Sequence, residues 1–200
     1  MSKGRAERLS DAMGPLVAVY DACVLYPSFL RDFLVRLAIH GRRQGVFRAK
    51  WTGRIHREWT GAILRQRPEL RAALRRTRQL MDQHVRGCRV RGYQRWEQRL
   101  TLPDEDDRHV LAAALACVAD VIVTFNTTDF PPATLAPFQV VAVEPDPFVY
   151  QLMESGIVES AAADHRSSLS RPPMTVSDYL DALVRNRLPG TAAALSRERI

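Results

Sequence analysis

Short apolar runs alternate with helical patterns along most of the chain. The first run, residues 16–20 (LVAVY), is rich in Val and follows Gly14 and Pro15, which is typical of a buried β-strand. Asp21 comes directly after it. The same features predict further strands at residues 46–51, 120–125 and 139–143.

Apolar residues between these strands recur at helical spacing. The first such stretch begins near Pro27, and we expect it to end at Gly41, because glycine is a common helix terminator. Thr52 is an N-cap residue for the next helix, which carries Glu58. Further helices are predicted at residues 68–84, within 85–98 after a short strand, and at 103–118.

Strands that alternate with helices predict a parallel sheet with helices on both faces. We therefore expect an α/β fold, a three-layer α/β/α sandwich with a central, mostly parallel sheet. After residue 147 only helical patterns follow, at residues 148–155, 157–166, 175–186 and 190–198. The predicted organisation is an N-terminal tail (1–15), an α/β domain (16–147) and a C-terminal helical extension (148–200).

The composition is that of a globular protein, with 200 residues of which 46% are hydrophobic and 26% charged. No run approaches the roughly 20 apolar residues that span a bilayer, and the first residues lack the apolar core of a signal peptide. We expect a cytoplasmic protein without a membrane partner. Cys23, Cys88 and Cys117 are widely spaced, which predicts neither a disulfide framework nor a zinc site.

The net charge of +7 conceals a division along the chain. Residues 31–99 carry 19 Lys and Arg against 5 Asp and Glu, whereas residues 100–164 carry 11 acidic residues against the single base Arg108. A polyanion bound by the first region and a cation bound by the second would explain both excesses. Arginines that coat solvated helix faces are the simpler explanation, so charge alone does not establish a nucleic-acid partner.

Acidic and amide side chains follow two of the predicted strands. Asp21 comes after residues 16–20, and Asn126 and Asp129 come after residues 120–125. Because binding groups gather beyond the carboxyl ends of parallel strands, we expect these side chains to lie close together.

A second acidic group, residues 104–107 (DEDD), stands at the start of the helix predicted at 103–118. Acidic residues at a helix N-terminus cap free N–H groups and complement the helix dipole, so capping is one explanation of this run. Four carboxylates in succession exceed what capping requires, and their mutual repulsion favours a bound cation. Oxygen ligands without sulfur indicate Mg²⁺ or Mn²⁺.

Glu58 is the only acidic residue between Asp32 and Glu69. Its position alone favours an ion pair with Arg54 one helical turn earlier. His56 and His109 have no Ser or Cys partner at a recognisable spacing, so we interpret both as packing or surface residues and leave them out of the catalytic set.

The ordered set of an Asp after the first strand, a lone Glu on an early helix, an Asp that opens DRHVLAAALA, and a strand that ends VTFNTTDF resembles PIN-domain ribonucleases. The likeness is strongest to the VapC toxins of bacterial toxin–antitoxin modules and covers roughly residues 16–150. Its most specific part is LPDEDDRHVLAAALACVADVIVTFNTTDFP, residues 102–131, with support from VYDACVLYPSFLRDFL and WTGRIHREW. The resemblance implies a PIN-like form of the α/β/α sandwich.

The resemblance also implies a site. Its catalytic carboxylates are Asp21, Glu58, Asp107 and Asp129, with Asp104 and Asn126 as additional metal ligands. Asp106 is a possible outer ligand, and Asn126 and Asp129 are expected to divide the fourth position. Cys23 departs from the small polar residue often found two positions after the first Asp.

The implied activity is Mg²⁺- or Mn²⁺-dependent hydrolysis of RNA phosphodiester bonds. Arg54, Arg57 and Arg65 are the expected contacts to the RNA backbone. The resemblance further implies a cognate antitoxin protein, and we expect a homodimer.

Three alternatives have different consequences. A haloacid-dehalogenase-like phosphatase requires a second Asp where this chain has Cys23, which argues against it. A non-enzymatic nucleic-acid-binding or regulatory module would use the basic helices alone. A DNA-directed PIN-type nuclease would share the carboxylates and differ only in its substrate.

Overall fold

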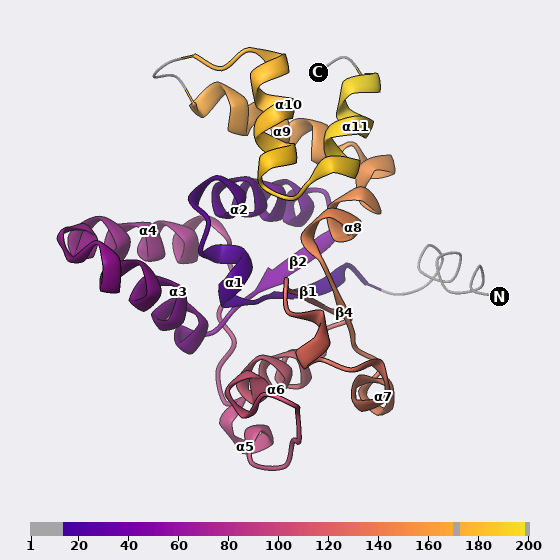
Figure 1. Cartoon of the computed structure of the whole chain (residues 1–200). Helices are drawn as coiled ribbons and strands as arrows, with labels where there is room; N and C mark the ends of the chain where they lie inside the picture. Colours follow the sequence, from indigo (N-terminus) through magenta and orange to yellow (C-terminus); the bar gives the residue numbers. More distant parts are fainter. Residues whose placement is uncertain (1–13, 170–172, 199–200) are drawn as a thin grey trace.

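A computed structural model describes residues 14–169 and 173–198. Most of the expected N-terminal tail therefore lies outside the described residues. Four parallel strands form one sheet in the order β2-β1-β3-β4 (Figure 1). They are β1 (Leu16–Tyr20), β2 (Phe47–Lys50), β3 (Val121–Val123) and β4 (Val141–Val143). Ala18 of β1 pairs with Ala49 on one side and with Val121 on the other, so β1 is a central strand.

Helices connect and cover the strands. Those before residue 140 are α1 (Ala22–Leu25), α2 (Ser28–Arg43), α3 (Gly53–Gln66), α4 (Arg71–His84), α5 (Gln94–Glu97), α6 (Arg108–Ala116) and α7 (Pro132–Leu135). The later ones are α8 (Pro145–Tyr150), α9 (Ile157–Ser168), α10 (Val176–Arg185) and α11 (Pro189–Glu198). Short 3₁₀ helices occupy Pro68–Leu70, Glu105–Asp107, Thr127–Asp129, Ala136–Phe138 and Met153–Ser155.

The layers agree with the prediction from the sequence. Helix α2 contacts β2 on one face of the sheet, and α6 contacts β1 and β3 on the other (Figure 1). The expected three-layer α/β/α sandwich with C-terminal helices is thus confirmed. Strands β1 and β3 are short and contain Ala18, Val19, Tyr20 and Val121–Val123, which are all buried, because both faces of the sheet are covered.

Aromatic rings join the sheet to the C-terminal helices. Tyr20 stacks on Trp51 with ring centroids 6.3 Å apart, and Phe148 of α8 meets the edge of Tyr20 at 6.1 Å and of Phe47 at 5.5 Å. All four rings are completely buried. The first helix after the sheet is therefore part of the main core.

A carboxylate ties the last helix to the same region. Both oxygens of Asp146, in α8, accept hydrogen bonds from the start of α11: Oδ2 from Gly190 N (2.8 Å), and Oδ1 from Thr191 N (2.8 Å) and Thr191 Oγ1 (2.7 Å). Gly190 permits this approach, since an added Cβ would lie 3.0 Å from Asp146 Oδ2. Helix α9 packs along α2, and His165 Nδ1 lies 3.1 Å from the Tyr179 hydroxyl of α10.

Two predicted helix ends were wrong. Helix α2 continues through Gly41 to Arg43, because Gly41 serves close packing: an added Cβ would lie 2.2 Å from the ring of Phe47. Helix α6 ends at Ala116 and not at Val118, which has a left-handed backbone (φ 52°) and is exposed. The strand expected within residues 85–98 is a single bridge between Trp51 and Arg89.

No helix among the described residues has the length and apolar character needed to cross a membrane.

Candidate active site

Asp21 occupies the junction of β1 and α1. Its backbone N–H donates to Val123 O (3.1 Å), so the carboxyl ends of β1 and β3 meet at this residue. The side chain is buried and accepts hydrogen bonds from Ala22 N, as the N-cap of α1, and from Thr124 Oγ1 at 2.7 Å. These donors fix the carboxylate at the edge of the sheet where the sequence predicted a site.

Cys23 fills the position where the sequence departs from the family pattern. Its Sγ lies 3.2 Å from Asp21 Oδ2 and 3.3 Å from Thr124 Oγ1, and it accepts a hydrogen bond from Phe125 N (3.2 Å). Burial, together with the charge of Asp21, raises the pKa of Cys23 to about 12. The thiol therefore stays protonated and supports Asp21 as a donor.

Glu58 projects from α3 and is half-buried. Its Oε1 lies 3.0 Å from Arg54 Nε and 2.9 Å from His109 Nε2. A carboxylate accepts hydrogen bonds only, so both nitrogens donate. Burial opposes ionisation, but His109 and Arg54 outweigh it and lower the pKa of Glu58. The ion pair expected from the sequence is present, and His109 is a further partner.

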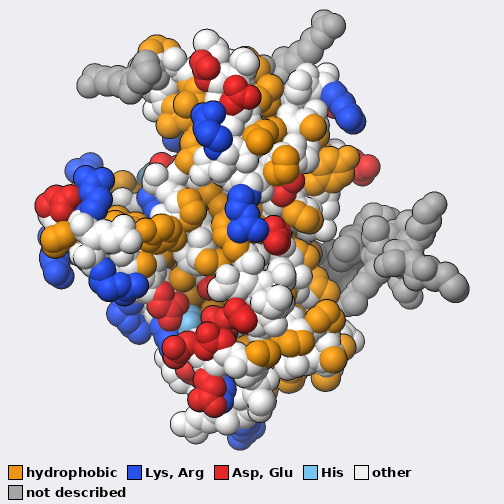
Figure 2. Space-filling view, viewed as in Figure 1, with side chains coloured by type: hydrophobic (Ala, Val, Ile, Leu, Met, Phe, Trp, Pro, Cys, Tyr) orange, Lys and Arg blue, Asp and Glu red, His pale blue; other side chains and the backbone are white. Residues whose placement is uncertain are grey.

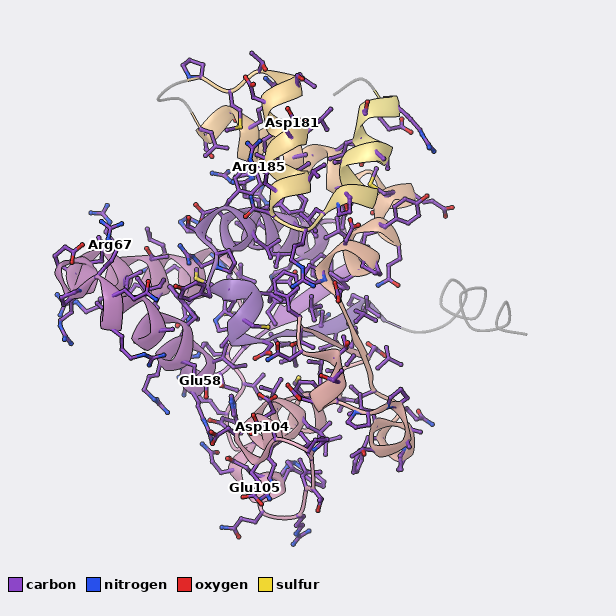
Figure 3. All side chains as sticks on the ribbon, in the orientation of Figure 1. Glu58, Arg67, Asp104, Glu105, Asp181 and Arg185 are labelled. Atoms are coloured by element: carbon purple, nitrogen blue, oxygen red, sulfur yellow. The ribbon has the colours of Figure 1, made fainter. Side chains whose placement is uncertain are left out.

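Asp107 is the N-cap residue of α6, yet its side chain makes no capping hydrogen bond. Its environment raises the pKa of its carboxyl to about 7, first by burial and then by the charges of Asp21, Asp104, Asp129 and Glu58. Four other carboxylates thus act on Asp107, one from its own acidic run and three from separate parts of the chain. Figure 2 shows acidic side chains gathered at this place, and Figure 3 shows Glu58 and Asp104 at neighbouring sides of it.

The other members of the acidic run have separate roles. Asp104 accepts a hydrogen bond from Asp106 N (2.8 Å), so capping explains this residue. Glu105 forms an ion pair with Arg108, and Asp106 is exposed beside Arg54. Capping therefore accounts for part of the run and leaves Asp107 without such a role.

Asn126 and Asp129 bracket the short 3₁₀ helix after β3. Asn126 is exposed, and its backbone N–H donates to Thr124 Oγ1 at 3.0 Å. Asp129 is partly buried, and its charge acts on Asp107. Both residues lie at the carboxylate edge, and their division of the fourth position stays a prediction.

The donor set fits a hard divalent cation. Five carboxylates (Asp21, Glu58, Asp104, Asp107 and Asp129) carry more negative charge than nearby bases offset, as the raised pKa of Asp107 indicates. Carboxylate oxygens are the ligands that Mg²⁺ and Mn²⁺ prefer. Within residues 14–169 and 173–198, no three Asp, Glu, His or Cys side chains already lie close enough together to hold a metal ion. To bind a metal, the carboxylates would have to move closer together. The hydrogen bonds that hold Asp21 and Glu58 in their present positions would oppose this movement.

The three arginines expected to contact RNA differ in their surroundings. The guanidinium of Arg54 lies 2.7 Å from Glu97 Oε1 and 3.6 Å from Asp106 Oδ1, besides its contact with Glu58. Arg57 and Arg65 are exposed on α3 and form no ion pair among the described residues. Arg54 therefore organises acidic side chains, and its contact with RNA stays a prediction, as do those of Arg57 and Arg65.

A C-terminal arginine also reaches this edge of the sheet. The guanidinium of Arg187, between α10 and α11, lies 4.1 Å from the ring centroid of Phe125, the residue between Thr124 and Asn126. Its Nη2 is 3.2 Å from Glu144 Oε2 after β4. Sequence reasoning missed Arg187, Thr124 and the role of His109, because each contact joins elements far apart in the chain.

Comparison with known families identifies the class. Residues 17–128 match the family model described as PIN domain, which covers more than half of the chain, and the chain therefore belongs to the PIN-domain family. Residues 145–197 match a second model, described as the VapC50 C-terminal domain. The resemblance to VapC-like PIN proteins that the sequence indicated for residues 16–150 is confirmed, and the C-terminal match extends it to the rest of the chain.

One curated relative is a Mycobacterium tuberculosis protein named "Putative ribonuclease VapC50". It is 38% identical over 79 residues, a match that spans 38% of this chain and 47% of the relative. The matched part is thus about half of that protein's length. No solved structure matches the chain significantly.

Proposed function

We propose that the protein is an endoribonuclease that binds Mg²⁺ or Mn²⁺ at the carboxylate cluster and hydrolyses phosphodiester bonds of RNA. The observation that carries the proposal is Asp107, a carboxyl whose pKa is raised to about 7 by burial and by four other carboxylates. Ionising such a carboxyl costs free energy in the metal-free protein, and acids with pKa values perturbed in this way cluster at functional sites. The relative's printed name, a ribonuclease, supports the same activity.

Bound divalent metal would supply an activated water and offset the charge that develops on the phosphate. Asp21, Asp107 and Asp129 would hold the metal, with Glu58 and Asp104 at the margin of the cluster. Thr124 and the backbone N–H of Ala22 orient Asp21, and His109 and Arg54 orient Glu58. Asp107 would have to lose its proton to serve as a ligand, so binding of the metal would be linked to pH.

Substrate class is tested with purified protein and three substrates: single-stranded RNA, tRNA and single-stranded DNA, each with Mn²⁺ or with EDTA. The proposal expects Mn²⁺-dependent cleavage of RNA by internal cuts and no comparable cleavage of DNA. Preferential cleavage of DNA would identify a DNA-directed nuclease. No cleavage of any substrate, together with RNA binding, would favour a non-enzymatic module.

We further propose that the protein is the toxin of a toxin–antitoxin pair, acts in the cytoplasm and forms a homodimer. Membership of the VapC-like PIN proteins supports this context. Expression of the wild-type chain should arrest growth of a bacterial host, and Asp21→Asn should not. Light scattering on the purified protein measures its oligomeric state, and a monomeric mass at all concentrations would contradict the dimer.

A further inference from the structure

A basic cleft lies at the edge of the sheet opposite the carboxylate cluster. It has a volume of about 580 Å³ and runs between the amino ends of β1 and β2, the end of α2 and the segment after α4. Its charged lining comes from these separate segments: Arg42, Arg43, Arg48, His84 and Arg86. Among the described residues, neither Asp nor Glu lines it.

A second hollow continues this surface along α4. It has a volume of about 450 Å³, is lined by Arg75 and Arg76, and shares Gln83 with the first cleft. In the part of the chain that the structure describes, no acidic residue lines this hollow either. The two concavities thus form one surface, which we call the arginine strip: Arg42, Arg43, Arg48, Arg75, Arg76 and Arg86. Figure 2 shows blue side chains clustered over the α3 and α4 region.

The strip arginines, like Arg57 and Arg65 on α3, have no acidic partner among the described residues, and in this they differ from Arg54 and Arg89. Arg54 and Arg89 are held by carboxylates, Arg89 through Asp82 at 2.6 Å, whereas none of the six strip arginines forms an ion pair within residues 14–169 and 173–198. Solvated helix faces would account for Arg75 and Arg76 on α4 and for Arg42 and Arg43 at the end of α2. They do not explain why Arg48 of β2 and Arg86 after α4 join them around a concave surface, where the positive potential is focused.

The distance from the carboxylates limits the possible ligand. Pro15 borders the cleft and precedes β1, while Asp21 follows β1. A five-residue strand is about 16 Å long at roughly 3.3 Å per residue, and a path over the surface is longer. A single nucleotide therefore cannot contact both sites. Two joined concavities that both carry arginines, and whose described lining residues include no acid, match an extended polyanion.

We propose that the arginine strip is a second RNA-binding surface, which holds the phosphodiester backbone of the substrate at a distance from the bond that is cut. This inference rests on the proposed ribonuclease function for the identity of the polyanion. Backbone contacts of this kind give affinity without sequence information and depend strongly on salt. The strip would favour long or structured RNA over short fragments.

The test uses Arg48→Gln/Arg86→Gln, two exposed strip residues from different segments, and a control of equal charge change, Arg185→Gln/Arg197→Gln, on the C-terminal helices. Binding of labelled tRNA is measured in EDTA, where no cleavage occurs, at several salt concentrations. The strip variant should bind severalfold more weakly, and its slope of log K against log salt should fall by about 1.4 to 1.8 for two lost contacts. The control should match the wild type.

Unchanged affinity and slope in the strip variant, with unchanged melting temperature, would overturn the proposal. Equal loss in the control would also overturn it, because the effect would then reflect net charge. A rise in melting temperature with inorganic phosphate, lost in the strip variant while tRNA binding is unchanged, would identify a small-anion site instead.

Cleavage of a short oligonucleotide separates this proposal from the proposed function. The strip variant should cleave it at the wild-type rate, since the fragment does not reach the strip. Failure of the wild type to cleave any RNA would refute the proposed ribonuclease activity. The tRNA-binding comparison in EDTA would still test whether the arginine strip binds RNA.

Discussion

His109 Nε2 lies 2.9 Å from Glu58 Oε1, so a buried imidazole on α6 holds the one acidic side chain of α3 at the carboxylate cluster. The two residues are 51 positions apart and belong to the first and last helices of the long connection between β2 and β3. His109 thus has a positioning role that its isolation in the sequence did not indicate. Residues that orient metal ligands commonly change metal affinity by about 10- to 100-fold.

The first prediction concerns His109. His109→Ala should shift the midpoint of the Mn²⁺-dependent rise in melting temperature to about tenfold higher concentration, because Glu58 loses a donor. His109→Gln retains a donor and should restore part of the affinity. Loss of stability in both variants without any change in the Mn²⁺ midpoint would show that His109 only fills the core. His40→Ala, a partly buried histidine that is paired with Asp164 on α9, is the control.

The second prediction concerns pH. The pKa of Asp107 is about 7 in the folded protein and about 3.9 in an unfolded chain. The folded state therefore binds the proton more tightly, and this contribution to stability is complete below pH about 4 and is lost as pH rises through 7. The wild type should lose more stability than Asp107→Asn between pH 5 and 8 in EDTA.

Thermal melts in EDTA measure this difference, and the comparison between the two proteins removes the effect of other titrating groups. At pH 8, Asp107→Asn should raise the melting temperature of the metal-free protein, since it removes a charge that four carboxylates repel. A lower melting temperature for the variant at pH 8 would contradict the account. In the wild type, Mn²⁺ affinity should increase as pH rises through 7.

The third prediction concerns the cap of α11. Asp146→Ala should lower the free energy of unfolding by about 1 to 2 kcal/mol, because three hydrogen bonds at the helix N-terminus are lost. Urea unfolding measures the change. Asp181→Ala, an exposed position on α10 (Figure 3), should leave stability within about 0.5 kcal/mol of the wild type. Equal effects of the two substitutions would refute the capping role.

The fourth prediction concerns Arg187, whose backbone is left-handed (φ 63°). Its contact with Phe125 compensates for this strain. Arg187→Ala should destabilise the protein by about 1 kcal/mol, because the stacking is lost and the strain stays. Arg187→Gly loses the same stacking but relieves the strain, so it should be more stable than the alanine variant in urea unfolding. The opposite order would contradict a strained backbone at this position.

The sequence predicted the elements that depend on local pattern. Apolar runs located all four strands, and the topology of a parallel sheet predicted that Asp21 and Asp129 lie at one edge. Thr52 was recognised as an N-cap, and its hydroxyl accepts from Ile55 N at 3.1 Å. These predictions succeeded because neighbouring residues alone determine them.

Features that depend on distant packing were missed. The sequence predicted a helix end at Gly41, but the helix continues there and the absence of a side chain accommodates the ring of Phe47. The spacing predicted the pairing of Arg54 with Glu58 but not its contacts with Glu97, 43 residues away, and Asp106. No pattern near Arg187 indicates that its side chain stacks on Phe125. Such relationships follow from the tertiary fold, which one sequence does not reveal.

The central claim is that the carboxylate cluster binds a divalent metal and thereby cleaves RNA. The most direct measurement is the single-turnover rate of RNA cleavage in Mn²⁺ by the wild type, Asp21→Asn, Asp107→Asn and the exposed control Glu154→Gln. Each aspartate variant should lose several kcal/mol of transition-state stabilisation by the metal, which corresponds to a rate about a thousandfold lower. The rate of the control should be unchanged. Cleavage at the wild-type rate by both aspartate variants would contradict the account.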